Sequence, residues 1–137
     1  MSFERIGKGF VGILLYLWQL PQNIIGLLIR LFCKGEKKRE IAGITVYYLK
    51  SFPGGISLGK TIMVGSTYVL TAKHERGHQI QSLILGPFYL IIIGLPSLLG
   101  NIYDRIFHAD WEYEESARWY YNQPWEHWAD KLGKVKR

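Results

Sequence analysis

The stretch TAKHERGHQIQS, residues 71–82, contains two histidines four positions apart, with a glutamate directly after the first one. No proline occurs in the surrounding sequence before Pro87, so we expect a single helix through this region. On a helix, His74 and His78 lie one turn apart on the same face, and both imidazoles can reach one metal ion. Glu75 then lies to the side of the metal, where it can act as a base.

The five letters HERGH match the H-E-x-x-H signature of the zincin metallopeptidases, in the form with glycine as its fourth residue. The chain resembles that family at this motif. Gly77 costs about 1 kcal/mol in a helix relative to alanine, which indicates that a strand or another helix approaches the backbone closely there. The alternative interpretation is a solvated helix with an ordinary histidine pair. A third protein ligand would decide between them, because catalytic zinc normally has three.

The third ligand is predicted from a second motif. The sequence after His78 lacks the glycine and third histidine of the metzincin branch, whereas PWEHWADKLG, residues 124–133, contains the E-x-x-A-D pattern of the gluzincin branch. This resemblance implies that Glu126 is the third zinc ligand and that Asp130 holds a ligand histidine by its far ring nitrogen. Pro124 also indicates that a helix begins just before Glu126.

A rival for the third ligand lies upstream, in DWEYEESARWYY, residues 110–121. Glu114 and Glu115 are the candidates, and Glu114 together with Ala117 matches half of the same pattern. Arg118 stands where the acidic partner is needed, so we prefer Glu126.

The N-terminal part contains a long apolar run, GFVGILLYLWQLPQNIIGLLIRLFC, residues 9–33. As a helix it is long enough to cross a hydrocarbon core of about 30 Å. Pro21, within the polar interruption QLPQN (19–23), removes a backbone donor and predicts a break. Two short helices that meet there and one kinked span explain the run equally well.

The basic segment 34–39 follows this run and favours the cytoplasmic side of a membrane. We therefore predict a membrane-associated chain, at the cytoplasmic membrane, with residues 1–40 as a membrane-associating helical segment and 41–137 as the metallopeptidase domain. The alternative is a buried helical hairpin followed by a solvated loop.

A second apolar run, SLILGPFYLIIIGLPSLLG, covers residues 82–100. If it simply crossed a bilayer, Glu126 would lie about 30 Å from the histidines, too far for one site. We therefore expect a buried or re-entrant helical hairpin, with the reversal at Gly86–Pro87 or at 94–97.

Residues 41–70 have a different character. The segments 41–49 and 56–70 are rich in β-branched and aromatic residues, and SFPGG (51–55) is a turn signal between them. They predict a small β-hairpin. By resemblance to zincins, an edge strand within 56–64 would bind an extended substrate peptide, with Ile56, Leu58 and Ile62 as its residues. The alternative is a purely structural hairpin.

The predicted fold is α+β and mostly helical: a minimal zincin-like core with an edge strand, an active-site helix and a C-terminal ligand helix, preceded by apolar helices. Cys33 is the only cysteine, which excludes an intrachain disulfide and a cysteine-based zinc site. The chain has 17 Lys and Arg against 11 Asp and Glu, a net charge of +6, but no recognition motif accompanies it, so we expect no nucleic-acid partner.

The predicted function is hydrolysis of peptide bonds at or near a membrane, with zinc as the cofactor and Glu75 as the general base. The partners are a peptide or protein substrate and membrane lipid. The alternative is a non-catalytic small membrane protein or a subunit of a larger complex. An oxyanion-stabilising residue is also expected, and five candidates stay open: Tyr113, Tyr120, Tyr121, His108 and His127.

Overall fold

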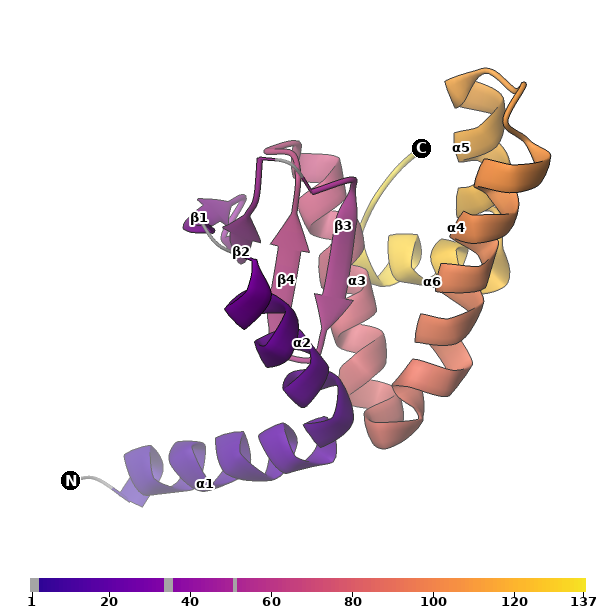
Figure 1. Cartoon of the computed structure of the whole chain (residues 1–137). Coiled ribbons are helices and arrows are strands. Elements are labelled where there is room, and N and C mark those ends of the chain that lie inside the picture. Colours follow the sequence, from indigo (N-terminus) through magenta and orange to yellow (C-terminus); the bar gives the residue numbers. More distant parts are fainter. Residues whose placement is uncertain (1–2, 34–35, 51) are drawn as a thin grey trace.

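The computed structural model describes residues 3–33, 36–50 and 52–137 and has an α+β fold that is mostly helical (Figure 1). Lys34 and Gly35 of the predicted basic flank, and Ser51 of the predicted turn, lie outside the described residues. The elements in chain order are α1 (Phe3–Trp18), α2 (Leu20–Phe32), β1 (Lys37–Ile41), β2 (Ile44–Tyr48), β3 (Gly55–Leu58), β4 (Thr61–Val64), α3 (Val69–Leu85), the 3-10 turn η1 (Gly86–Phe88), the π-helical turn η2 (Leu90–Gly94), α4 (Leu95–Phe107), α5 (Tyr113–Tyr121) and α6 (Pro124–Gly133).

The four strands form one mixed sheet in the order β1-β2-β4-β3. β1 pairs with β2 and β3 with β4 in antiparallel hairpins, and β2 runs parallel to β4. The sheet is larger than the single hairpin predicted, because the chain also turns at 42–43 and at 59–60, inside the two segments that were each predicted as one strand. Gly43 and Gly59 stand at these turns with positive φ, a conformation that glycine adopts without a steric penalty.

β3 is the edge strand that packs against α3 and α2, and the other edge of the sheet is β1. Ile56 and Leu58 lie on β3, as predicted, whereas Ile62 lies on β4, which has neighbours on both sides. The side chain of Ile62 is buried in the core with Val46 and Val64. The structure therefore corrects the prediction for Ile62: its backbone is already paired within the sheet and cannot bind a substrate peptide.

Two helices cover the two faces of the sheet: α2 lies in front of it and α3 behind it in Figure 1. Behind the sheet, α3 also packs tightly against α6. A β-carbon on Gly77 of α3 would overlap the backbone carbonyl of Ala129 on α6, and one on Gly133 of α6 would overlap that of Lys73 on α3. The close approach predicted at Gly77 is confirmed, and the neighbour is the helix that carries Glu126.

The apolar run 9–33 is bent by 84° between α1 and α2. Its polar interruption is buried at this bend: Gln22 donates to Ser82 Oγ at 2.9 Å and to the carbonyl of Gly86 at 2.7 Å, and Ser82 donates to Gln19 at 2.7 Å. These bonds attach the bend to the end of α3. Of the two interpretations left open by the sequence, the structure has two helices that meet at the break.

The chain reverses direction directly after α3, at η1. Gly86 has a positive φ, and a β-carbon there would overlap the indole of Trp18, so this position requires glycine. The expected return is therefore present at Gly86–Pro87. The second suggested break, at 94–97, is absent, because η2 and α4 form one continuous helix, Leu90–Phe107.

Among the described residues, Leu90–Phe107 is the one helix that is long and apolar enough to cross a membrane by length and composition, and most of it is exposed. The bent pair Gly7–Trp18 and Leu20–Phe32 passes the same test only when its two helices are taken together.

Candidate metal centre

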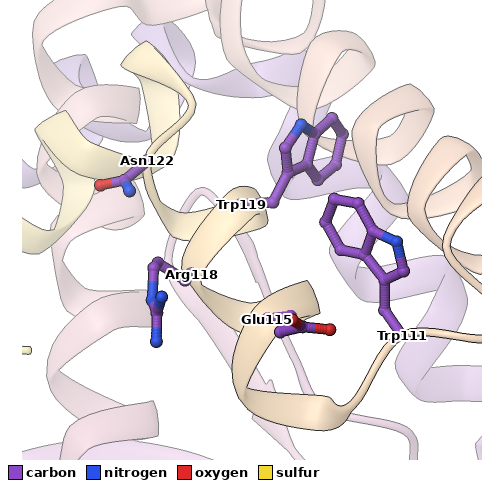
Figure 2. A pocket seen from close by; sticks show the side chains of 5 residues that line it. All are labelled: Trp111, Glu115, Arg118, Trp119 and Asn122. Carbon is purple, nitrogen blue, oxygen red and sulfur yellow. The ribbon is translucent and has the colours of Figure 1, made fainter.

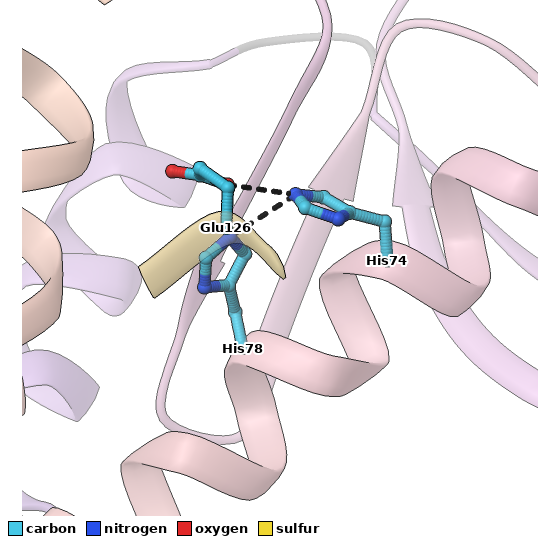
Figure 3. A group of neighbouring side chains, drawn as sticks. All are labelled: His74, His78 and Glu126. Carbon is cyan, nitrogen blue, oxygen red and sulfur yellow. Dashed lines mark hydrogen bonds and ion pairs between the residues drawn. The ribbon is translucent and has the colours of Figure 1, made fainter. Parts of the chain in front are cut away.

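Three side chains from two helices converge at the crossing of α3 and α6. His74 and His78 extend from α3, and Glu126 extends toward them from the first turn of α6 (Figure 3). Glu126 Oε2 lies 3.1 Å from His74 Nε2 and 3.0 Å from His78 Nε2, and the two Nε2 atoms are 3.1 Å apart. All three residues are buried, and in the described part of the chain they form the one group able to hold a metal ion.

The far nitrogen of each imidazole is fixed by a hydrogen bond. His74 Nδ1 lies 2.7 Å from Asp130 Oδ1, and a carboxylate can only accept, so Nδ1–H is the donor. His78 Nδ1 lies 2.7 Å from the amide oxygen of Gln81, whose amide nitrogen donates to the carbonyl of Trp125 at 2.8 Å. With both Nδ1 atoms protonated, both Nε2 atoms of the neutral rings present lone pairs to the centre of the group.

As long as both rings stay neutral and no metal is bound, two nitrogen lone pairs and a carboxylate oxygen face one another with no donor among them. Such an arrangement repels unless a cation lies between the three atoms. Zinc binds nitrogen and oxygen at about 2.0–2.2 Å, so three ligand atoms in a tetrahedral site lie about 3.3–3.5 Å apart. The observed separations of 3.0–3.1 Å are close to that spacing. The residues fit a metal ion held by two histidines and one glutamate.

The electrostatics of the metal-free group lead to the same conclusion. Burial lowers the pKa of His74, but its hydrogen bonds to Asp130 and Glu126 outweigh that effect and raise the pKa to about 9. Burial raises the pKa of Glu126, yet its interactions with the two histidines keep it below the usual range. The site is therefore built for an ionised carboxylate beside positive charge, which a proton or a metal ion can supply.

Glu75 follows the first histidine and is also buried. Its Oε2 atom has no hydrogen-bond partner among the described residues, and the same is true of Glu126 Oε1. Burial raises the pKa of Glu75, partly offset by the nearby histidines. A carboxylate with a raised pKa and an unpaired oxygen is suited to accept a proton from a reactant.

The two histidines and Glu75 line a cleft of about 300 Å³. Its lining includes His74, Glu75 and His78 from α3, the strand β3 with the preceding segment from Phe52, and one side of α4. A β-carbon on Gly55 would lie 2.7 Å from Glu75 Cγ, so the general-base candidate packs directly against the edge strand. The hydroxyl of Tyr89 donates to the carbonyl of Ser57 on the same strand at 3.1 Å.

The rival third ligands lie elsewhere. Glu114 and Glu115 are exposed on α5. Glu115 lines a separate pocket of about 450 Å³. Figure 2 shows it with the other lining residues, Trp111, Trp119, Arg118 and Asn122. Neither glutamate belongs to the group formed by the two histidines and Glu126.

The five oxyanion candidates are also separated by the fold. Tyr113 and His127 line an outer cavity near the C-terminus, and the ring of His108 stacks on Trp111 away from the cleft. Tyr120 and Tyr121 line the cleft. The Tyr120 hydroxyl lies 3.0 Å from Ser97 Oγ on α4, and burial followed by the nearby Glu126 carboxylate raises its pKa.

Sequence reasoning missed two residues of this site. Gln81, which holds His78, follows that histidine by three positions on one helix, so the spacing was a usable signal. Arg137 donates to Asp130 Oδ2 at 2.7 Å and lies over the ring of Tyr121. Its position seven residues after Asp130, beyond the end of α6, gave no such signal.

The chain matches no model of a known protein family, no curated protein and no solved structure. The resemblance to zincins therefore rests on the two motifs and on the geometry that brings His74, His78 and Glu126 together.

Proposed function

We propose that the protein is a zinc-dependent peptidase that hydrolyses peptide bonds at or near a membrane. The observation that carries this proposal is the convergence of the His74, His78 and Glu126 ligand atoms, together with a cleft that both histidines and the buried Glu75 line. A structural metal site has no use for such a carboxylate, whereas hydrolysis needs a base beside the metal.

A bound zinc ion would be held by His74, His78 and Glu126; it lowers the pKa of water toward about 7 and polarises a substrate carbonyl. Glu75 takes a proton from the attacking water and then delivers it to the leaving amine. Asp130 and Gln81 keep the two imidazoles oriented.

Tyr120 is the residue of the five candidates that we assign to the developing oxyanion. Tyr120 lines the cleft, and its raised pKa keeps its hydroxyl protonated as a donor. An extended substrate would pair with the edge of β3 at Gly55, next to Glu75 and before the Ser57 carbonyl that Tyr89 occupies.

Membrane association is part of the proposal. Large apolar side chains are exposed along α1, α2 and the helix Leu90–Phe107. Lipid would cover them, and the basic segment 34–39 would lie on the cytoplasmic side of the cytoplasmic membrane. The helices α1, α2 and Leu90–Phe107 would then serve membrane attachment, while the sheet, α3 and α6 would carry the catalytic site.

The test combines metal analysis with hydrolysis of a mixed peptide library, for three forms of the purified protein. The wild type should contain about one zinc per chain and cleave peptides. Glu126→Ala should lose the zinc, and Glu75→Gln should keep the zinc but lose the cleavage. Absence of zinc from the wild type would refute the peptidase and leave the non-catalytic membrane component as the better interpretation. Zinc in the wild type without any cleavage would refute the peptidase, and cleavage retained by Glu75→Gln would refute the catalytic role of Glu75.

A further inference from the structure

The helix Leu90–Phe107 has two different sides. Its cleft side presents Ser97, Leu98, Asn101 and Arg105. Three of these are polar and recur every four residues, so they form one stripe along the helix. The other exposed side chains of this helix are almost all apolar: Ile91, Ile92, Leu95, Leu99, Ile102, Tyr103, Ile106 and Phe107. This helix therefore forms one wall of the cleft, with mostly polar side chains toward the cleft and apolar side chains on its other exposed surface.

The opposite wall is also backed by an apolar helix. The free strand β3 forms that wall, and α2 packs on β3 at Gly26, where a β-carbon would lie 3.2 Å from Leu58 Cβ. The side of α2 away from the sheet exposes Ile24, Leu27, Leu28 and Leu31. The bend between α1 and α2 is held by the buried bonds of Gln22, so α2 keeps this position. Both walls of the cleft therefore adjoin apolar surface.

The site lies level with the interior of the apolar helix, not with its ends. The 18-residue helix is about 27 Å long, close to the roughly 30 Å of a bilayer core. Ser97, which contacts Tyr120 beside Glu126, lies about 10 Å from the start of this helix at Leu90. Lipid that covers the apolar side of the helix then reaches the level of the metal ligands.

We propose that the substrate of this cleft is a membrane-inserted polypeptide segment, which enters from the lipid between β3 and α4; this inference rests on the proposed peptidase function. A helix in lipid satisfies its own backbone groups and must unwind to be hydrolysed, and each unpaired polar group costs several kcal/mol there. The edge of β3 at Gly55 and Ile56, beside the Ser57 carbonyl that Tyr89 already occupies, and the polar side chains of Asn101 and Arg105 supply hydrogen-bond partners for the unwound segment. The backbone of a soluble peptide is already hydrogen-bonded to water, so it does not require polar side chains on a lipid-covered helix.

The test is a binding measurement by disulfide trapping in zinc-loaded Glu75→Gln protein, with Cys33→Ser to remove the native thiol. Leu98→Cys places a thiol in the cleft, and Leu99→Cys is the matched control: the two leucines are adjacent and 58% and 55% exposed, but only Leu98 lines the cleft. The protein is reconstituted in phosphatidylcholine vesicles that contain a minor share of phosphatidylglycerol.

The probe is a synthetic apolar peptide long enough to span the bilayer, with lysines at both ends and one activated disulfide at its centre. A second peptide has the same central residues within polar, water-soluble flanks. We expect the spanning peptide to form several-fold more adduct at Leu98→Cys than at Leu99→Cys, and the soluble peptide to form little at either. Equal adduct at both positions, adduct at neither, or preference for the soluble peptide would overturn the inference.

The outcome is separate from that of the proposed function. Zinc binding with cleavage of soluble peptides, combined with no preferential trapping of the spanning peptide, would overturn the substrate class and leave the peptidase intact. A wild type without zinc would remove the peptidase whatever the trapping result.

Discussion

Gly77 of α3 and Ala129 of α6 meet so closely that a β-carbon on Gly77 would overlap the carbonyl oxygen of Ala129. Gly77 lies one position before His78, and Ala129 lies between Glu126 and Asp130. The contact between the two backbones therefore sets the distance at which the ligands of one helix reach those of the other.

Gly77→Ala should accordingly separate the two helices. We expect a loss of about 1–3 kcal/mol in the free energy of unfolding from overpacking, together with loss of zinc. Denaturant unfolding and metal analysis measure the two effects. The control is Gly12→Ala on α1, where no atom lies within 4 Å of the added carbon, so zinc content should be unchanged and stability should rise by up to about 1 kcal/mol. Retention of zinc by Gly77→Ala would contradict this account of the site.

Asp130→Asn should weaken zinc binding about 10–100-fold, because a neutral amide replaces the carboxylate that accepts the hydrogen bond from His74 Nδ1. Competition with a chromophoric chelator measures the affinity. Asp104→Asn is the matched control: Asp104 holds His108 in a similar pair at 2.8 Å, away from the cleft, and zinc affinity should not change. Equal effects of the two substitutions would argue against a specific role for Asp130.

The pH dependence of stability should differ between metal-free and zinc-loaded protein. In the metal-free chain the pKa of His74 is raised from 6.5 to about 9, so the folded state binds that proton more tightly than the unfolded state. Its contribution to stability is complete below pH 6.5 and is lost as the pH rises to about 9. Urea unfolding in the presence of a chelator should show this decline across the window.

Zinc replaces the proton on His74, so the decline should disappear at saturating zinc. Zinc binding within the same window should release a proton, which calorimetry in two buffers of different ionisation enthalpy detects. Metal-free stability that is flat or rises from pH 6.5 to 9 would show that His74 is not protonated in the folded state.

Gly55→Ala should reduce hydrolysis without removing zinc, because the added carbon would displace the carboxylate of Glu75. A general base typically raises the rate about 10²–10⁴-fold, so we expect kcat to fall by about a hundredfold or more. Gly94→Ala is the control within the same cleft, since its new carbon would meet its nearest neighbour, Leu90, at an ordinary 3.6 Å. Unchanged kcat in Gly55→Ala would indicate that Glu75 does not act from the observed position.

Tyr120→Phe should lower kcat by about 10²–10³-fold, the usual effect of removing one donor from an oxyanion site, with zinc content unchanged. Tyr121→Phe is the comparison, because Tyr121 lines the same cleft but its ring lies between His74 and Arg137. If Tyr121→Phe alone impaired kcat, the oxyanion role would belong to Tyr121.

The parts of the site that the sequence predicted are those fixed within a single helix. His74 and His78 share a face because they are four residues apart, and the same spacing places Glu126 and Asp130 together on α6. The helical fold class, the return of the chain at Gly86 and the close approach at Gly77 also followed from local patterns, because glycine and proline restrict the backbone at their own positions.

The number and order of the strands did not follow from the sequence. The hydrophobic pattern of residues 56–70 does not distinguish one long strand from two short ones, and it therefore predicted Ile62 on the edge strand. Only the pairing of β4 with both β2 and β3 placed it in the core.

The sequence by itself determined which side chains share a helical face, since that depends only on the 3.6-residue period of the backbone. The tertiary structure decided that Glu126, and not Glu114 or Glu115, completes the group, and that Asp130 of α6 reaches His74 of α3. That choice depends on how α6 packs on α3, through the contacts of Gly77 and Gly133, and such contacts between distant segments exist only in the folded chain.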